Sequence, residues 1–171
     1  MAIGERIKRI RNIRKLTQKE LGLAVGFDEN TADVRIAQYE SNTRTPKEEM
    51  LRKIANALDV NYAAIYVSPL YAAEDVMFTL FELDEHYPIR LHEIVDDTDP
   101  DFTEKHIAVN FHTRLLDEFL SEWVQRKKDL ADGVISKAEY MEWKLNWPRT
   151  CDAGGKFEPA KQWRKPPETT G

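Results

Sequence analysis

Two neighbouring stretches decide the fold of the N-terminal part: TQKELGLAVGF at residues 17–27 and RIAQYESNTRTP at residues 35–46. Thr17 and Glu20 have the spacing of a capping box, in which the threonine accepts from a free amide at the helix start and the glutamate reaches back to the cap. The apolar residues that follow at helical spacing are Leu21, Ala24 and Val25. Because Gly26 stands where a helix needs a left-handed exit, we expect this helix to end there.

The second stretch predicts another helix, with one apolar and one polar side, followed by a polar loop. Its inward residues are expected to be Ile36, Tyr39 and Ala37, whereas Arg35, Gln38 and Glu40 fall on other faces. A polar face that includes Arg and Gln suits the groove of a duplex. The two stretches together predict two helices joined by a turn.

A helical pattern also precedes this pair. Residues 3–15 repeat isoleucine at helical spacing among six Arg and Lys residues, which predicts a first helix. The isoleucines are Ile3, Ile7, Ile10 and Ile13.

Two more helices are expected after the pair. Thr45 is expected to cap a helix that has Pro46 at its first position, and Glu48 would complete a second capping box. The residues of this helix that turn inward are Met50, Leu51, Ile54, Ala55 and Leu58. Asn61 is expected to cap a short fifth helix that runs through Tyr66, so that five helices fit into residues 1–67.

Over residues 3–66 the sequence resembles the Cro/repressor-type helix-turn-helix family, also called the XRE family. The matching residues are Thr17, Gln18, Glu20, Leu21, Gly26, Ile36, Gln38, Glu40, Arg44 and Pro46, with Leu51, Ile54, Ala55 and Leu58 further on. The resemblance implies a lambda-repressor-like bundle of five helices that binds DNA, in proteins that are usually dimeric repressors or regulators. It implies double-stranded DNA as the partner.

The sequence departs from the family between the turn glycine and the second helix, where FDENTADVR adds about four residues. This insertion places Asp28, Glu29 and Asp33 where the chain should approach an anionic duplex. Thr31 is the preferred cap of the second helix, which would leave Asp33 in its first turn. A start at Asp28 is the alternative and would lengthen the helix.

Base-reading and phosphate-binding roles are expected of different residues. Arg35 and Gln38 are the candidates for base edges, since Arg suits guanine and Gln suits adenine in the major groove, and Asp33 could instead accept from cytosine. The resemblance implies phosphate contacts at a helix start and in the loop after the second helix. Those candidates are Gln18, Thr43, Arg44 and Lys47.

Charge divides the chain into three segments. Residues 1–67 carry 12 basic and 9 acidic side chains, net +3, in a chain of net charge −5. Residues 68–147 have a net charge of −10, which a duplex would repel, and residues 148–171 have +2. We therefore expect a DNA-binding domain at 1–67, an acidic dimerisation or interaction domain at 68–147, and a Pro- and Gly-containing tail at 148–171 that is disordered.

The acidic segment predicts a small α+β module of a helix, a β-hairpin and two helices, so that the whole chain is mainly α. A helix over residues 71–87 is followed by two short extended runs, PIRLHEIV and HIAVNFHT, of which the second alternates cleanly. These runs could pair as a hairpin across DDTDPDFTEK, and two helices separated at Asp132 and Gly133 follow them. The first helix has an apolar stripe of Val76, Met77, Leu80, Phe81 and Leu83, expected in the core. The large aromatics Trp123, Tyr140, Trp143 and Trp147 are expected in the core of the module, or alternatively at a dimer seam.

The sequence contains little that supports a catalytic site or a metal site. Asp97, Asp99 and Asp101 begin like a calcium loop, but the glycine and glutamate that such a loop requires later are missing. His92, His106 and His112 lack a carboxylate or thiolate at a fixed spacing. The single cysteine, Cys151, permits no internal disulfide. We expect no enzyme, no cofactor and no metal, and, since no apolar run is long enough for a bilayer, a cytoplasmic protein without a membrane partner.

The hypothesis from sequence is a dimeric repressor of a prokaryotic or mobile-element operon that binds a roughly palindromic operator. One alternative is a DNA-binding head fused to an acidic protein-binding effector, such as an inhibitor of a host defence nuclease. A ligand-sensing switch is the other.

Overall fold

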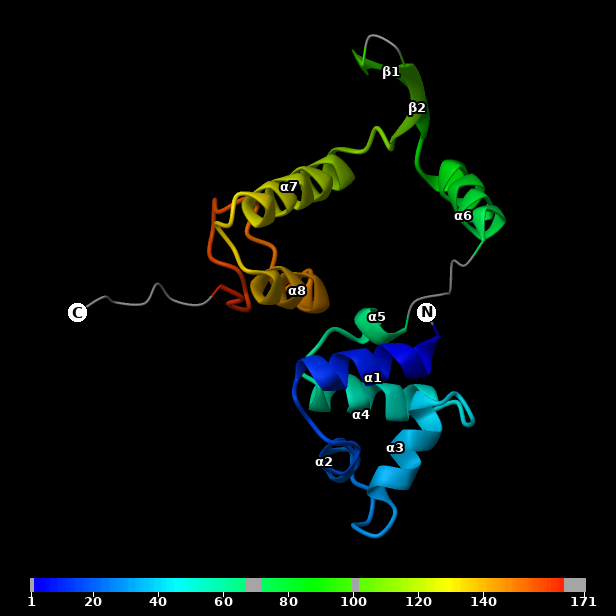
Figure 1. Cartoon of the computed structure of the whole chain (residues 1–171), viewed down its shortest axis with the longest axis vertical. Coiled ribbons are helices and arrows are strands. Elements are labelled where there is room, and N and C mark those ends of the chain that lie inside the picture. Colours follow the sequence, from blue (N-terminus) through cyan, green and yellow to red (C-terminus); the bar gives the residue numbers. More distant parts are fainter. Residues whose placement is uncertain (1, 67–71, 100–101, 165–171) are drawn as a thin grey trace, which may run out of the picture. The chain divides into compact units, whose positions relative to one another are not determined.

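The computed structural model describes residues 2–66, 72–99 and 102–164, with the side chains of 96–104 excepted (Figure 1). The chain folds into two compact units. The first unit comprises Met1–Pro69, Gly133–Cys151 and Glu158–Gly171, and the second comprises Leu70–Asp132 and Asp152–Phe157. The second unit is thus formed by two insertions in the chain of the first.

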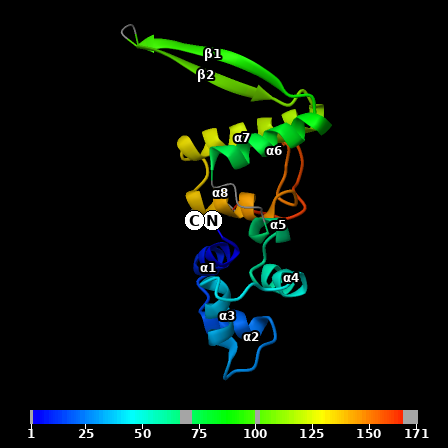
Figure 2. The same cartoon turned by 90° about the vertical axis from the view of Figure 1, so that its right-hand side faces the viewer.

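The N-terminal part of the first unit is a bundle of five helices (Figures 1 and 2). The helices are α1 (Ile3–Ile13), α2 (Gln18–Ala24), α3 (Ala32–Glu40), α4 (Glu48–Ala57) and α5 (Tyr62–Ile65). Their apolar faces meet in one core, which contains Ile7, Ile10, Leu21, Val25, Ile36, Tyr39, Leu51, Ile54, Ala55, Leu58, Val60 and Ile65. The predicted order of five helices is confirmed.

The start and the end of α2 follow from local chemistry. Thr17 Oγ1 accepts from the Glu20 amide (3.1 Å), and the Glu20 carboxylate accepts from the Thr17 amide (2.7 Å), as the capping box predicts. Gly26 has φ +93°, the left-handed exit. The inward face differs from the prediction, because Gly22 is buried and Ala24 is exposed. A Cβ on Gly22 would lie 2.4 Å from the carbonyl oxygen of Ala32, so only glycine permits this close approach of α2 and α3.

The caps of the later helices are partly as predicted. Asn61 Oδ1 accepts from the Ala63 amide (2.8 Å) and starts α5 as expected. The prediction that Thr45 caps α4 with Pro46 at its first position is wrong. Pro46 is buried, the backbone remains extended through Lys47 at the N-cap (ψ 162°), and the helix begins at Glu48.

Helix α8 (Lys137–Asn146) belongs to the same unit and extends its core. Leu145 is buried in the core of the five-helix bundle, and its carbonyl oxygen accepts from the Asn61 amide (2.9 Å). Arg14, the residue that follows α1, donates two hydrogen bonds to the Glu142 carboxylate on α8 (2.5 and 3.2 Å). The bundle is therefore completed by a helix that lies far along the chain from the other five.

Residues 148–164 also have defined positions, although their composition predicted disorder. Thr150 and Trp163 are buried, and Lys161 Nζ pairs with the Asp59 carboxylate at 2.6 Å. The expected domain limits at residues 67 and 147 remain a prediction. The first of these limits falls next to residues 67–71, which lie outside the described part.

The second unit consists of α6 (Ala73–His86), the antiparallel strands β1 (Arg90–Asp99) and β2 (Phe102–Asn110), and α7 (Arg114–Ala131). The predicted order of helix, hairpin and two helices is confirmed, with α8 as the second of these helices. The strands are longer than the sequence indicated and continue through most of DDTDPDFTEK. Among the described helices, none is long and apolar enough to cross a membrane.

The apolar stripe of α6 does not lie in a core, in contrast to the prediction. Within the described part of the chain α6 has no buried residue, and Val76, Met77 and Phe81 are exposed. The aromatics divide as well: Trp143 is buried, Trp147 and Tyr140 are half-buried, and Trp123 is exposed. Helical periodicity located the stripe correctly, but the pattern alone does not show whether another element packs on it.

The contribution of α8 to the bundle can be tested with Leu145→Ala. Removing this buried side chain should lower the free energy of unfolding by about 2–5 kcal/mol, since it leaves a cavity in the core. Amide hydrogen exchange of α1 measures this, because these amides report opening of the bundle. The control is Lys137→Ala on the exposed start of α8, and equal protection of α1 in both variants would contradict the role of α8.

Candidate nucleic-acid interface

Helices α2 and α3 form a shallow groove of about 380 Å³ on the surface of the first unit. Gln18 contributes from the start of α2, and Asp33 and Gln38 contribute from α3. The remaining lining residues are Val34, Ala37 and Ser41. The groove therefore presents an amide, a carboxylate and small apolar groups side by side, which are the side-chain types that contact base edges.

A buried ion pair holds α3 against α1 below this groove. Arg11 Nε and Nη2 donate to the two carboxylate oxygens of Glu40 at 2.5 and 3.0 Å, and both side chains are buried. The hydrogen bond to Glu40 raises the pKa of Arg11 above its ordinary value, although burial acts in the opposite direction. Gln18 Nε2 donates to Glu40 as well (2.8 Å), so one carboxylate connects α1, α2 and α3. Glu40 was expected on an outer face, and that expectation is wrong.

The candidates for base contact lie differently from one another. Asp33 is exposed, Gln38 is half-exposed, and both line the groove. Arg35 is half-exposed and is not among the groove residues. The geometry thus brings Asp33 and Gln38 together with Gln18.

The candidates for phosphate contact lie on the groove and on the loop after α3. Thr43, Arg44 and Lys47 are exposed. The loop is ordered by local hydrogen bonds, since the hydroxyls of Ser41 and Thr43 are 2.9 Å apart and the Arg44 amide donates to the Gln38 carbonyl (3.1 Å). Gln18 Nε2 donates one of its two hydrogens to Glu40, so the second hydrogen is the one that can be donated to a phosphate oxygen.

The acidic insertion forms a turn just before α3. The Thr31 amide donates to the Asp28 carbonyl (2.9 Å), and α3 begins at Ala32 with Thr31 at the N-cap, as in the preferred interpretation. Lys19 Nζ donates to Glu29 at 2.9 Å, and this hydrogen bond lowers the pKa of the Glu29 carboxyl. The insertion therefore ties up one lysine at the start of α2 rather than lying across α3.

Sequence reasoning missed Val34. Its side chain is 53% exposed and lines the groove one turn before Gln38. An exposed aliphatic group next to an amide suits the methyl group of thymine. If α3 begins directly after Thr31, Val34 and Gln38 stand at positions i and i+4 of one helix. This spacing indicates that the two side chains are neighbours on the same face.

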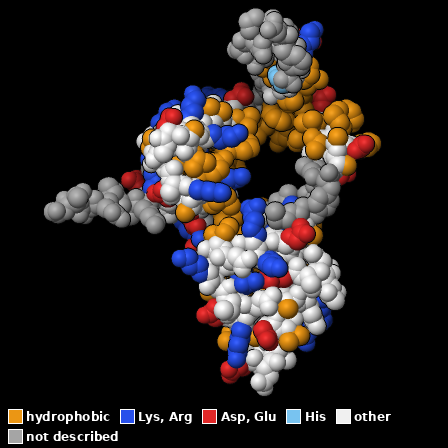
Figure 3. Space-filling view, in the orientation of Figure 1, with side chains coloured by type: hydrophobic (Ala, Val, Ile, Leu, Met, Phe, Trp, Pro, Cys, Tyr) orange, Lys and Arg blue, Asp and Glu red, His pale blue; other side chains and the backbone are white. Residues whose placement is uncertain are grey.

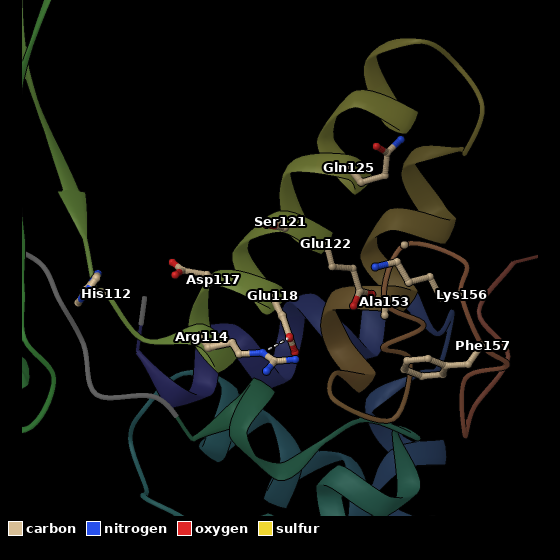
Figure 4. Close-up of a pocket in the computed structure, with 11 residues that line it drawn as sticks. His112, Arg114, Asp117, Glu118, Ser121, Glu122, Gln125, Ala153, Lys156 and Phe157 are labelled. Atoms are coloured by element: carbon tan, nitrogen blue, oxygen red, sulfur yellow. Dashed lines mark hydrogen bonds and ion pairs between the residues drawn. The ribbon is translucent and has the colours of Figure 1, made fainter.

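A second concavity, of about 950 Å³, lies in the second unit (Figure 4). It is open, and is lined by His112, by α7 and by the segment from Ala153 to Phe157. Its charged side chains are largely occupied within the chain: Arg114 donates to Glu118 (3.1 Å), and buried Glu122 accepts from the Asp152 amide (3.3 Å). The mixture of charges does not indicate one chemical class of ligand.

Comparison with known proteins finds a family model that matches part of the first unit. Residues 4–67 match the model of a family described as helix-turn-helix domain. A solved structure titled "Crystal structure of transcriptional regulator BswR" is 28% identical, with a match that covers 52% of this chain and 82% of that chain and a TM-score of 0.38. No curated protein sequence matches.

Glu40→Ala tests whether the buried ion pair holds the interface together. It should lower the free energy of unfolding by about 3–5 kcal/mol, because it leaves the Arg11 guanidinium buried without its counter-ion. Urea denaturation measures the effect. Glu48→Ala is the matched control, since it removes an exposed partner of Arg52 worth at most about 1 kcal/mol. Equal losses in the two variants would contradict the role of the pair.

Proposed function

We propose that this chain, whose residues 4–67 are a helix-turn-helix domain of the XRE type, is a sequence-specific DNA-binding transcriptional regulator. It acts as a dimeric repressor of a prokaryotic or mobile-element operon. The observation that carries the proposal is the exposed groove in which Gln18, Asp33, Val34 and Gln38 adjoin.

In this proposal α3 enters the major groove of double-stranded DNA. Gln38 reads adenine through its amide, Val34 contacts a thymine methyl group, and Asp33 accepts from the amino group of cytosine. Arg35 reads guanine from the flank of the helix. The close packing of α2 on α3 at Gly22 and the Arg11–Glu40 pair fix the angle at which α3 is presented.

Phosphate contacts come from the rim of the same surface. Arg44 and Lys47 supply cations, and Thr43 supplies a hydroxyl. Gln18 supplies a side-chain amide at the start of α2. Residues 1–67 carry a net charge of +3, whereas the rest of the chain is acidic, so attraction to the duplex is localised on this unit. Two copies would address half-sites about one helical turn, ~34 Å, apart.

Two substitutions separate base reading from phosphate binding. Gln38→Ala should relax the preference at one base pair at a cost of ~1–3 kcal/mol on the preferred sequence only. Arg44→Ala should weaken binding to every duplex and reduce the salt slope by ~0.9. Selection from random duplexes gives the preferred sequence, and titrations at several salt concentrations give both quantities. If the two variants lost affinity in the same way, this division of roles would be wrong.

A third substitution tests the acidic insertion. Glu29→Gln should raise affinity for any duplex and steepen the salt dependence by up to ~0.9, because it releases Lys19 for a phosphate. The matched control is Glu49→Gln, which releases the exposed Lys53 on α4 instead. An equal gain in both variants would mean that net charge rather than Lys19 is responsible.

The net charge of −10 on residues 68–147 favours a second candidate function, an acidic surface that binds a basic protein. An anionic surface of this kind imitates nucleic acid toward a nuclease. The full chain should then bind a basic nuclease, and this binding should weaken as the salt concentration rises. DNA that occupies the nuclease should compete with the chain. Both results together would support this candidate.

A further inference from the structure

The first turn of α1 has no N-cap side chain of its own. Its N-cap residue is Ala2, whose methyl group cannot accept a hydrogen bond. In most helices the side chain of the N-cap accepts from the amide of the second or third helical residue. The second residue of α1 is Gly4, and its amide donates instead to Asn42 Oδ1 at 3.0 Å. A side chain from 38 residues further along the chain therefore caps α1.

Asn42 is also the residue at which the chain leaves α3. Ser41 is the C-cap of α3, and the next residue, Asn42, has φ +58°. Helices commonly end with a residue in this left-handed conformation, which glycine, asparagine and aspartate adopt more readily than other residues. Glycine has no side chain that could reach the Gly4 amide. Asparagine thus meets two requirements at this position, the backbone exit from α3 and the cap of α1.

The end of α3 and the start of α1 approach each other closely. Gly4 is buried, and a Cβ on it would lie 2.1 Å from the carbonyl oxygen of Tyr39 and 2.7 Å from that of Glu40. Only glycine fits here, so the two backbones are in direct contact. The Arg11–Glu40 ion pair joins the same two helices further along α1. The cap by Asn42 is therefore a second connection between α1 and α3, at the point where the loop begins.

The loop that starts at Asn42 carries the candidates for phosphate contact. Residues 43–45 are exposed between Asn42 and the buried Pro46, and Arg44 is the cation among them. Figure 3 shows the Lys and Arg side chains on the visible face of the first unit interspersed with Asp and Glu rather than gathered in one patch. Dispersed charge attracts a duplex, but it does not fix which side chain meets which phosphate. The place of Arg44 thus depends on how the two ends of the loop are held.

We propose that Asn42 is a positioning residue for DNA binding, which caps α1 and thereby holds Arg44 where it meets a phosphate. Asn42 acts through Arg44 and does not itself contact the duplex. Without the Asn42 side chain the loop is released at its α3 end, and the loss of conformational entropy on ordering it falls on the binding step. The inference rests on the proposed function, because it explains how the phosphate contact of Arg44 is prepared.

Asn42→Gly tests the inference in the full-length protein, because it keeps the left-handed backbone and removes only the acceptor. It should weaken binding to every duplex by roughly 3- to 10-fold, in the range of coupling between neighbouring residues. The salt slope should fall by up to ~0.9, the value for one phosphate contact. The preferred sequence should stay the same, since Gln38 is not affected. Titrations of a preferred and an unrelated duplex at several salt concentrations measure all three quantities.

A double-mutant cycle shows whether Asn42 acts through Arg44. In a chain that already carries Arg44→Ala, Asn42→Gly should cost little further affinity, and full additivity of the two losses would overturn the inference. Asn61→Gly is the matched control, since it removes a cap of the same kind from α5, where Asn61 Oδ1 accepts from the Ala63 amide. An equal fall of the salt slope in this control would assign the effect to general destabilisation and would also overturn the inference.

Hydrogen exchange of the protein without DNA separates failure of the inference from failure of the proposed function. The Gly4 amide should exchange faster in Asn42→Gly than in the wild type and should keep its protection in Asn42→Asp, which retains an acceptor. Unchanged exchange in Asn42→Gly overturns the inference whether or not DNA binds. A wild-type protein that binds no duplex refutes the proposed function and the positioning role together. A wild-type protein that binds, with an unchanged salt slope in Asn42→Gly, refutes the inference alone.

Discussion

The first unit depends on the buried contact between Arg11 and Glu40. A carboxylate in a helix core must be paired with a cation or protonated, and here it is paired by two hydrogen bonds from α1 and by a third from Gln18 on α2. The contact fixes the rotation of α3. With Glu40 inward, Gln38 and Val34 are necessarily turned toward the groove. The orientation of the side chains proposed to read DNA therefore depends on an ion pair that is not part of the groove.

The sequence predicted those features whose causes lie within a few residues. The capping box of Thr17 and Glu20, the cap at Asn61 and the exit at Gly26 all act over at most three positions, and each is found in the structure. The inward position of Glu40 was not predicted, because its partner lies 29 residues away and a charged residue alone indicates exposure. For the proposed interface, the structure places Asp33 and Gln38 on the groove but not Arg35, and Val34 emerged only once the start of α3 was known.

The same limit holds over longer distances in both units. Periodicity located the helices and the hairpin, yet it gave no indication that the polar side of α7 would be the buried one. Arg126 is held by Asp152, 26 residues further on, and Arg14 is held by Glu142, 128 residues further on. A pattern shows which residues favour burial, whereas their partners are set by the tertiary fold.

The chain leaves the first unit after α5 and returns to it at α8, so the second unit is joined to the first at both ends. Each connection shortens the span over which a helix-turn-helix domain can diffuse from its second unit. If two second units associate, their DNA-binding domains are held at a high effective concentration, and binding of one half-site makes binding of the other nearly intramolecular. Two connections limit the positions open to a DNA-binding domain more than one flexible linker would.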